Sequence, residues 1–391
     1  MLRQPIATVL ICLGLTLYVA VGLRTEIKFT SIKPIPESLM QDFNIYKGAR
    51  AAVEQGQDPY ADRNIGSGFL YPPPSLLFFL PFDLLSPEGQ ASLFTALNLS
   101  ALGLILYGIA AIYKLPFARI WWWFPLAFGF APFLEVLHMG QVNILVSLAV
   151  LVMLAYLDRS PVVSGFALGG AILLKVTPLA YVLYLAVVSR FRVIGFAILA
   201  VAALVLAWAV AFSFQHFITY ADVFRDLTLV SLPADGNGQS LPALLTFHGI
   251  IPSESMQETQ RVLDVFLAIA VFCSALLVRR GSMPEGLFVV LGLALVSASN
   301  VVWYHHYAFL LLPLFVWLAA TNLNPLAIAW VVGGLTIVNL DRWGLTSGLL
   351  AHAFIGATIL LILATQVADV VRQRQRGEDT EPLPTPRTAG A

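Results

Sequence analysis

The stretch from Val162 to Val188 reads VVSGFALGGAILLKVTPLAYVLYLAVV, and it decides the class of fold. A helix needs about 20 apolar residues to cross a bilayer, and this run exceeds that length. Lys175 interrupts it, although a cation inside a membrane span costs about 2.5–3.5 kcal/mol even on the most lenient scale. Pro178 favours a break in the helix three residues later. We therefore predict two short helices that meet at Lys175–Pro178 and bring the lysine to the membrane surface.

The rest of the chain has the same apolar character. Of its 391 residues, 59% are hydrophobic and 11% are charged, and the mean hydropathy is +0.82. A soluble domain carries about 25% charged residues, so the sequence predicts an all-α polytopic membrane protein whose main solvent is the lipid bilayer. A formal net charge of zero gives no attraction to nucleic acid. Cys12 and Cys273 lie in apolar stretches and indicate neither a disulfide framework nor a metal site.

Hydropathy divides residues 1–367 into one domain of about twelve transmembrane helices. The candidate spans are 5–23, 91–113, 120–138, 142–157, 162–174, 177–189, 193–214, 263–279, 285–300, 306–320, 325–340 and 345–367. Residues 24–70 and 215–262 are hydrophilic and are predicted to form loops, and 368–391 is predicted to be a disordered tail. The run from Ile6 to Leu23 is also compatible with a signal peptide. Its length and the lack of a small-x-small cleavage site favour an uncleaved first helix.

Lysine and arginine in the short loops set the predicted orientation. One arrangement places every basic loop in the cytoplasm, together with the tail, and puts 24–70 and 215–262 outside. It requires that residues 72–86, PPPSLLFFLPFDLLS, enter the membrane without crossing it. If that segment crosses, the next two loops invert and three basic residues move outside. The basic residues are Lys114, Arg119, Arg159, Arg190, Arg192, Arg279, Arg280, Arg372, Arg374 and Arg376.

The first outer loop is predicted to contain a helix. Asp42, Tyr46 and Arg50 recur at a spacing of four, which places them on one helical face. Gly56 is suited to end that helix, and Asp58 before Pro59 is suited to cap the next turn. Asp58 therefore has a structural explanation. For Asp42 two roles stay open, a cap of the same helix and a catalytic carboxylate.

Four further polar clusters are predicted to face the same outer surface, as an active site between helices and loops requires. A phosphate is a natural partner for Lys175, although an ion pair with Glu135 is an alternative. His305 and His306 have no carboxylate nearby in the sequence, so they indicate phosphate binding or proton transfer more than a metal site. The clusters are Tyr71-Pro72-Pro73, Gly140-Gln141-Val142-Asn143, Leu174-Lys175-Val176-Thr177-Pro178 and Trp303-Tyr304-His305-His306.

Taken in order, these motifs resemble glycosyltransferase family 87 over residues 40 to 320. The chain departs from the family pattern at Asn300-Val301-Val302, where members often carry Pro and Ser. The residues that carry the resemblance are Asp42-Phe43, Tyr46, Ala49-Arg50-Ala51, Gly56, Asp58-Pro59-Tyr60, Phe69, Tyr71-Pro72-Pro73, Asn98, Gly140-Gln141-Val142-Asn143, Leu174-Lys175, Pro178, Gly238-Gln239-Ser240-Leu241, Ser299, Trp303, His305 and His306.

The resemblance implies a membrane glycosyltransferase of the GT-C fold. Characterised members resemble mannosyltransferases that take a hexose from polyprenyl-phosphate-mannose and act at the outer face of the plasma (inner) membrane, facing the periplasm or cell exterior. The acceptor is then a lipid or a glycan, and no cofactor or metal is expected. The implied roles are catalytic base for Asp42, donor-phosphate binding for Lys175, His305 and His306, and substrate binding for Tyr46, Arg50, Asp58, Tyr60, Tyr71, Gln141, Asn143 and Gln239.

Two other functions fit the same residues. A transporter or flippase of lipid-linked saccharides would use Asp42 and Lys175 for binding alone and leave its substrate chemically unchanged. A polysaccharide ligase or polymerase with a diphosphate donor would need more outer arginines than Arg50, Arg63, Arg225 and Arg261 supply. For transfer from a lipid monophosphate, direct displacement predicts inversion at the anomeric carbon.

Overall fold

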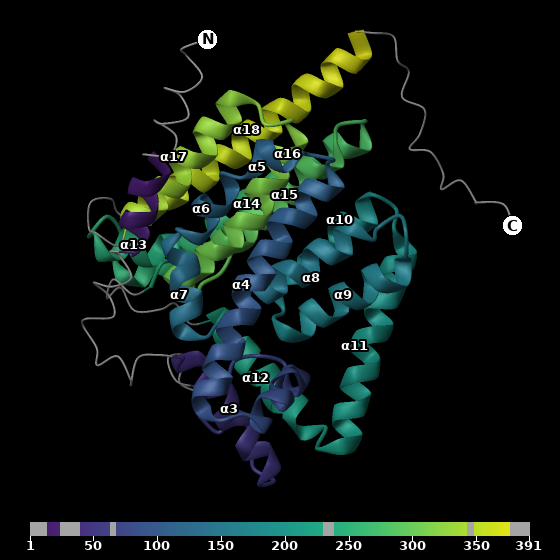
Figure 1. The fold of residues 1–391 in the computed structure, drawn as a ribbon, viewed down its shortest axis with the longest axis vertical. Helices are drawn as coiled ribbons and strands as arrows, with labels where there is room; N and C mark the ends of the chain where they lie inside the picture. The colour runs from purple at the N-terminus through teal and green to yellow at the C-terminus, as the bar shows by residue number, and fades with distance from the viewer. Residues whose placement is uncertain (1–13, 24–39, 63–67, 230–237, 342–347, 376–391) are drawn as a thin grey trace, which may run out of the picture.

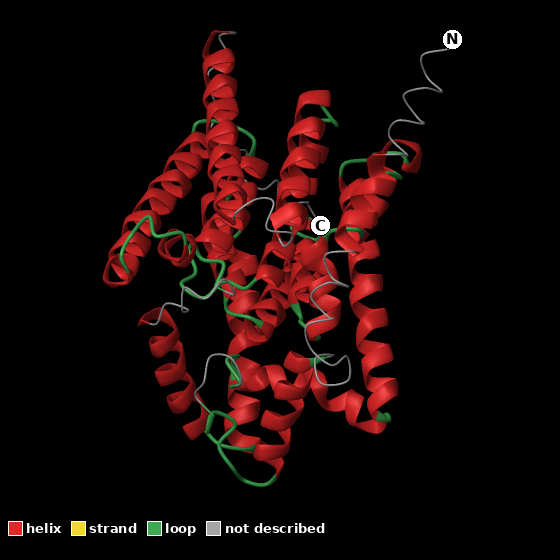
Figure 2. Ribbon diagram, turned by 90° about the vertical axis from the view of Figure 1, so that its left-hand side faces the viewer, coloured by secondary structure: helices red, strands yellow, loops and turns green. Residues whose placement is uncertain are grey.

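The fold is described from a computed structural model that covers residues 14–23, 40–62, 68–229, 238–341 and 348–375. Within these ranges the chain forms helices and loops, with no strand (Figure 2). The first half contains helix Gly14–Leu23, α3 (Gln41–Glu54), η1 (Pro73–Leu84), α4 (Pro87–Ile112), α5 (Phe117–Ile120), α6 (Trp123–Phe128), α7 (Ala131–Met139), α8 (Asn143–Ala155), α9 (Pro161–Leu174), η2 (Thr177–Ala180) and α10 (Tyr181–Val187).

The second half continues with longer helices and two short 3₁₀ segments. They are α11 (Phe191–Ala211), α12 (Gln215–Leu229), α13 (Leu241–Phe247), η3 (Ser253–Ser255), α14 (Met256–Arg279), α15 (Pro284–Ser297), η4 (Tyr304–Leu310), α16 (Leu311–Ala320), α17 (Pro325–Asp341) and α18 (Gly348–Gln375).

Twelve full spans are not confirmed. In the described part of the chain, four helices are long and apolar enough to cross a membrane, namely Pro87–Ile112, Phe191–Ala211, Ser253–Arg279 and Gly348–Gln375. Most of the other predicted spans are shorter apolar helices of 10–17 residues, and 120–138 is divided among α5, α6 and α7. Hydropathy counts apolar residues along the chain, whereas proline and glycine divide the same apolar runs into pieces.

The break between α7 and α8 is the sharpest of these divisions. The two helices pass the test for a span only together, and they are bent by 112° at the break. Gly140 ends α7 in the left-handed conformation, with φ 72° and ψ 42°, which glycine adopts without steric cost. Gln141 and Asn143 therefore lie at the tip of a bent helix pair, as in a re-entrant loop.

The predicted break at Lys175 is confirmed. Lys175 follows α9 with extended backbone angles, and Pro178 lies in the first turn of η2. Gly165 and Gly169 let α9 pack closely on α11, because a Cβ at Gly169 would lie 2.7 Å from that of Ala200. This close packing fixes the end of α9, and with it the position of Lys175.

Helix α3 confirms the helix predicted within residues 24–70, and it packs on η1. Phe43 forms edge-on or tilted ring contacts with Phe79, Phe82 and Phe94 at centroid separations of 4.9–5.7 Å. Such aromatic pairs contribute about 0.5–1.5 kcal/mol each. η1 has 12 residues and spans about 24 Å at the rise of a 3₁₀ helix, less than the ~30 Å hydrocarbon core. That residues 72–86 enter without crossing stays a prediction.

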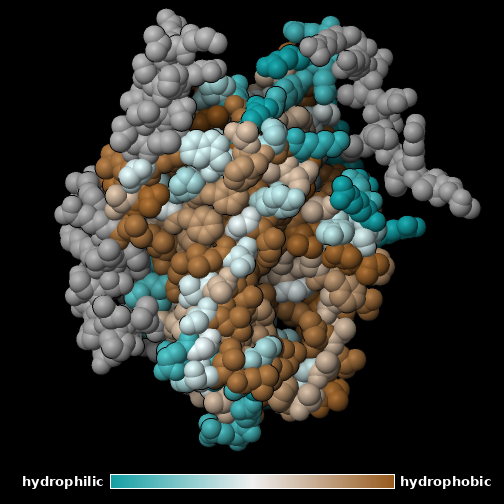
Figure 3. Space-filling view, in the orientation of Figure 1, coloured by the Kyte–Doolittle hydropathy of each residue, from teal (hydrophilic) through white to brown (hydrophobic). Residues whose placement is uncertain are grey.

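The basic loops come together at one end of the molecule. Arg279 donates to the carbonyl of Ala186, Gln373 donates to that of Gly281, and Arg119 donates to Asn322. Figure 1 shows α5 and the C-terminal half of α18 at this end and α3 with α12 at the opposite end. On the face shown in Figure 3, hydrophobic residues dominate the middle and hydrophilic residues gather mainly toward the two ends.

Helix α18 extends further than the sequence indicated. Residues 368–375, predicted to begin a disordered tail, continue the helix to Gln375. Parts of the predicted loops, 24–39 and 230–237, lie outside the described residues, as does 376–391.

Candidate active site

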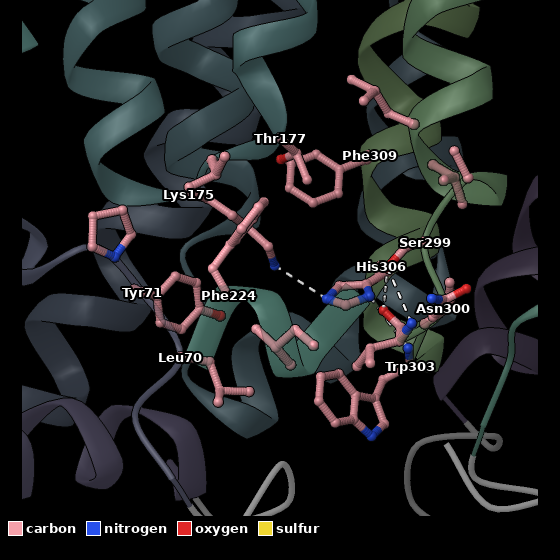
Figure 4. Close-up of a pocket in the computed structure, with 18 of the residues that line it drawn as sticks. Leu70, Tyr71, Lys175, Thr177, Phe224, Ser299, Asn300, Trp303, His306 and Phe309 are labelled. Carbon is pink, nitrogen blue, oxygen red and sulfur yellow. Dashed lines mark hydrogen bonds between the residues drawn. The ribbon is translucent and has the colours of Figure 1, made fainter. Parts of the chain in front are cut away.

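A cavity of about 370 Å³ lies where the polar motifs meet. Figure 4 shows Tyr71 and Lys175 on one side of it and His306, Trp303 and Ser299 on the other. Its volume falls within the range of small-molecule sites, about 300–1,000 Å³. The lining residues are Leu70, Tyr71, Pro72, Lys175, Val176, Thr177, Tyr220, Phe224, Leu227, Asp264, Leu295, Val296, Ala298, Ser299, Asn300, Val301, Val302, Trp303, His306 and Phe309.

The Lys175 ammonium is the cationic centre of this cavity. Its Nζ donates to Oδ1 of Asn143 at 2.8 Å and lies 3.1 Å from Nε2 of His306. It also lies 5.5 Å from the ring centroid of Tyr71 and 5.3 Å from that of Phe309. No carboxylate of the described residues forms an ion pair with it, so the alternative pairing with Glu135 is not found. The cation is therefore held by neutral groups and faces an open volume.

The imidazole of His306 faces competing donors. The backbone N–H of Trp303 donates to its Nδ1 at 3.3 Å, while the ammonium of Lys175 approaches Nε2. A neutral imidazole has only one acceptor nitrogen, so it cannot accept fully from both. An anion that accepted a hydrogen bond from Lys175 would remove this competition and leave Nε2–H of His306 as a second donor.

Gln141 joins α3 to the cavity. Its Oε1 accepts from the hydroxyls of Tyr46 at 3.3 Å and Tyr71 at 3.0 Å, and its Nε2 donates to Oδ2 of Asp42 at 2.5 Å. Gly140 lets the turn before Gln141 approach α3 closely, since a Cβ at Gly140 would lie 2.7 Å from that of Phe43. Tyr71 lines the cavity, but Asp42 does not.

The carboxyl of Asp42 has an unusual pKa for an aspartate. Burial raises its pKa to about 6, against the lowering effects of the Gln141 hydrogen bond and the Lys175 charge. Met40, not Asp42, is the N-cap of α3, and its side chain caps nothing. Since the Asp42 carboxylate is bonded by a side-chain amide, the structure does not support the role as a helix cap.

The structure separates the two histidines. His306 lines the cavity, whereas His305 does not and stacks on Trp303 with an interplanar angle of 21°. The carbonyl of His305 accepts from Nδ2 of Asn143 at 3.1 Å. His305 therefore positions the amide that holds Lys175, and of the two rings that of His306 faces the cavity.

The remaining predicted residues support the site from outside the cavity. Arg50 forms an ion pair with Glu54 within α3 and another with Asp83, which ties α3 to η1. Asp58 accepts from the backbone N–H of Tyr60 in a turn, and the Tyr60 hydroxyl donates to the carbonyl of Tyr71 at 2.6 Å.

Gln239 has a comparable supporting position. Its backbone N–H donates to the carbonyl of Val302 at 2.7 Å, and its own carbonyl accepts from Tyr307 and contacts Nε2 of His352. The segment that begins at Gly238 is thereby held against the segment that precedes His306.

Sequence reasoning missed several cavity residues. Tyr220 and Phe224 come from α12, a part of the predicted loop 215–262 in which no motif was found, and Asp264 comes from α14. The signal for Asp264 was present, since it lies within the predicted span 263–279, and a charge within a span marks function.

One comparison with known proteins gives a match. The model of glycosyltransferase family 87 matches residues 69–299 of this chain, more than half its length. The match contains Tyr71, Gln141, Asn143 and Lys175, and it ends before His306, so the sequence resemblance over 40 to 320 is shown for its central part. No curated protein matches the chain.

Proposed function

This chain belongs to glycosyltransferase family 87, and from that membership we propose that it transfers a hexose, with mannose as the first candidate, from a polyprenyl-phosphate sugar to a lipid or glycan hydroxyl. Apolar helices long enough to span a membrane accompany the family match, so a membrane-delivered donor suits the protein. The observation that carries the proposal is Lys175, a cation without a carboxylate partner among the described residues, on the wall of a cavity.

A lipid phosphate fits the groups around Lys175. The bond to the anomeric carbon breaks as the phosphodiester becomes a monoester, and negative charge grows on its oxygens. Lys175 and Nε2–H of His306 donate charge-assisted hydrogen bonds to those oxygens. Asn143 holds the lysine by its Oδ1 and is itself held by the carbonyl of His305. The ammonium of Lys175 is therefore positioned before the sugar-carrying lipid binds.

Asp42 is the proposed base. The acceptor oxygen forms the new bond to the anomeric carbon, its proton passes to the Asp42 carboxylate, and the polyprenyl phosphate leaves. One displacement without a covalent enzyme intermediate inverts that carbon. Asp42 is half-buried and lies outside the cavity lining, linked through Gln141 to Tyr71. The acceptor therefore approaches from the side of α3 while the donor occupies the cavity.

The proposed location is the plasma membrane, with the site facing the periplasm or cell exterior. Its support is the separation of charge in the fold: the basic loops meet at the end that carries α5 and the end of α18, while α3 lies at the opposite end (Figure 1). Basic loops remain in the cytoplasm.

The test is chemical. Purified protein in proteoliposomes receives radiolabelled polyprenyl-phosphate-mannose and candidate lipid or glycan acceptors, and mass spectrometry follows the products. Transfer predicts an acceptor heavier by one hexose and free polyprenyl phosphate, with an inverted anomeric configuration. A donor that crosses the membrane unchanged would support a flippase and refute the proposal. Unchanged transfer by Asp42→Asn would remove Asp42 from the role of base.

A further inference from the structure

A second charged side chain lines the cavity that contains Lys175. Asp264 is exposed and projects from α14 into this volume, and Oδ1 accepts from Nε2 of Gln260 at 2.8 Å. Its Oδ2 has no hydrogen-bond partner among the described residues. The cavity is therefore polarised, with a cation from the end of α9 and a carboxylate from α14.

The position of Asp264 in the chain marks it as a candidate functional group. It lies within Ser253–Arg279, one of the helices apolar enough to span a membrane, and a charge in such a helix marks a functional site by default. Arg261 is one turn earlier but forms no ion pair with it in the described structure, whereas Arg225 and Asp222 at the same spacing approach to 3.4 Å. Arg261 therefore does not neutralise the Asp264 carboxylate, which is available to a ligand in the cavity.

Gln260 holds Asp264 in place. Its side chain is 3% exposed, and the same Nε2 that donates to Asp264 lies 3.3 Å from the carbonyl of Ser297 at the end of α15. One oxygen of the carboxylate is thus fixed by a buried amide. The buried Oε1 of Gln260 has no hydrogen-bond partner in the described chain. The side of the cavity formed by α14 therefore presents hydrogen-bond acceptors.

We propose that Asp264 binds hydroxyl groups of the sugar that is transferred, and so helps to select it. An ionised carboxylate only accepts hydrogen bonds, so it repels the phosphate and suits neutral hydroxyls. Phosphate and sugar are one covalent unit in the donor, and the phosphate is assigned to Lys175 in the same cavity. Asp42 is outside the cavity lining and stays with the acceptor. This inference rests on the proposed function.

The test compares two lipids that differ only by the sugar. The full chain in nanodiscs is titrated with polyprenyl-phosphate-mannose and with polyprenyl phosphate, and Kd is measured for each. Asp264→Asn is expected to bind the mannosylated lipid about tenfold to a hundredfold more weakly, the worth of a hydrogen bond to a charged group, and polyprenyl phosphate without change. Glu258→Gln, which removes an exposed carboxylate from the same helix outside the cavity, is the matched control and is expected to bind both lipids as the wild type does.

Each outcome decides between the assignments. Equally weaker binding of both lipids by Asp264→Asn, or an equal effect of Glu258→Gln, would overturn the role of Asp264. So would full retention of both affinities by Asp264→Asn, while the wild type binds both lipids. A wild-type protein that binds neither lipid would refute the proposed donor itself. Elution of the variants at the wild-type volume in size-exclusion chromatography confirms that they fold.

Discussion

The pKa of Asp42 predicts the pH dependence of transfer. A base must be ionised, and burial raises this pKa to about 6 from an ordinary value of 3.8. The fraction of ionised Asp42 is then about nine-tenths at pH 7, half at pH 6 and one-tenth at pH 5, since each pH unit below the pKa reduces it about tenfold. We expect kcat/KM to fall about tenfold between pH 7 and pH 5. An aspartate with the ordinary value would lose less than about a tenth over the same range.

Gln141 supplies the discriminating variant. Its Nε2 donates to the carboxylate and so lowers the pKa of Asp42 against the effect of burial. A hydrogen bond to a charged group contributes about 1.5–3 kcal/mol, and one pKa unit corresponds to about 1.36 kcal/mol. Gln141→Leu is therefore expected to move the acid limb upward by about one to two pH units.

The assay is the initial rate of sugar transfer at subsaturating donor, in proteoliposomes equilibrated from pH 4.5 to 9, because kcat/KM reports the free enzyme. Asp42→Asn should remove the limb and lower the rate about 10²- to 10⁴-fold. Asp222→Asn, which changes a partly exposed carboxylate of α12 that pairs with Arg225, should leave the limb near pH 6. A limb near pH 4 in the wild type, or one that persists near pH 6 in Asp42→Asn, would show that another group titrates and refute the reasoning.

Three further predictions concern the phosphate site and the bend beside it. Lys175→Ala should lower kcat about 10²- to 10³-fold at normal expression, as for loss of one donor to a developing anion; full activity would exclude the phosphate role. His306→Gln should lower kcat/KM about tenfold or more, and His305→Gln much less, because only His306 lines the cavity; the reverse order in the transfer assay would contradict this. Gly140→Ala should cost about 1–3 kcal/mol in a melting assay because its φ is 72°, whereas Gly48→Ala, with open space around it in α3, should be neutral or stabilising.

The sequence alone determined the class of protein, and it singled out Tyr71, Lys175 and His306, which line the cavity. An excess of apolar residues identifies the lipid bilayer as the solvent, because the transfer free energies of the residues into lipid add up along each segment. Lys175 and Pro178 located a break, because a charge and a missing N–H are unfavourable in one continuous span. The ordered motifs indicated the family that the match to residues 69–299 shows.

Only the tertiary structure decided what each residue contacts. The number of full spans depends on where helices bend, as at the 112° break between α7 and α8. At such a break the direction of a side chain follows from packing and not from spacing. Gln141, beside the break, contacts Asp42, which is 99 residues away in the chain, and Tyr71, which is 70 residues away. Packing of α3 on η1 likewise pairs Arg50 with Asp83.

The adjacent histidines give the same lesson at the smallest scale. The sequence could not divide their roles, because neighbouring residues share a motif and a hydropathy. In the structure the ring of His306 meets Lys175 on the cavity wall, while that of His305 stacks on Trp303. The physical reason is that hydropathy is a property of each segment, whereas a site is a set of directions fixed by contacts between segments distant in the chain.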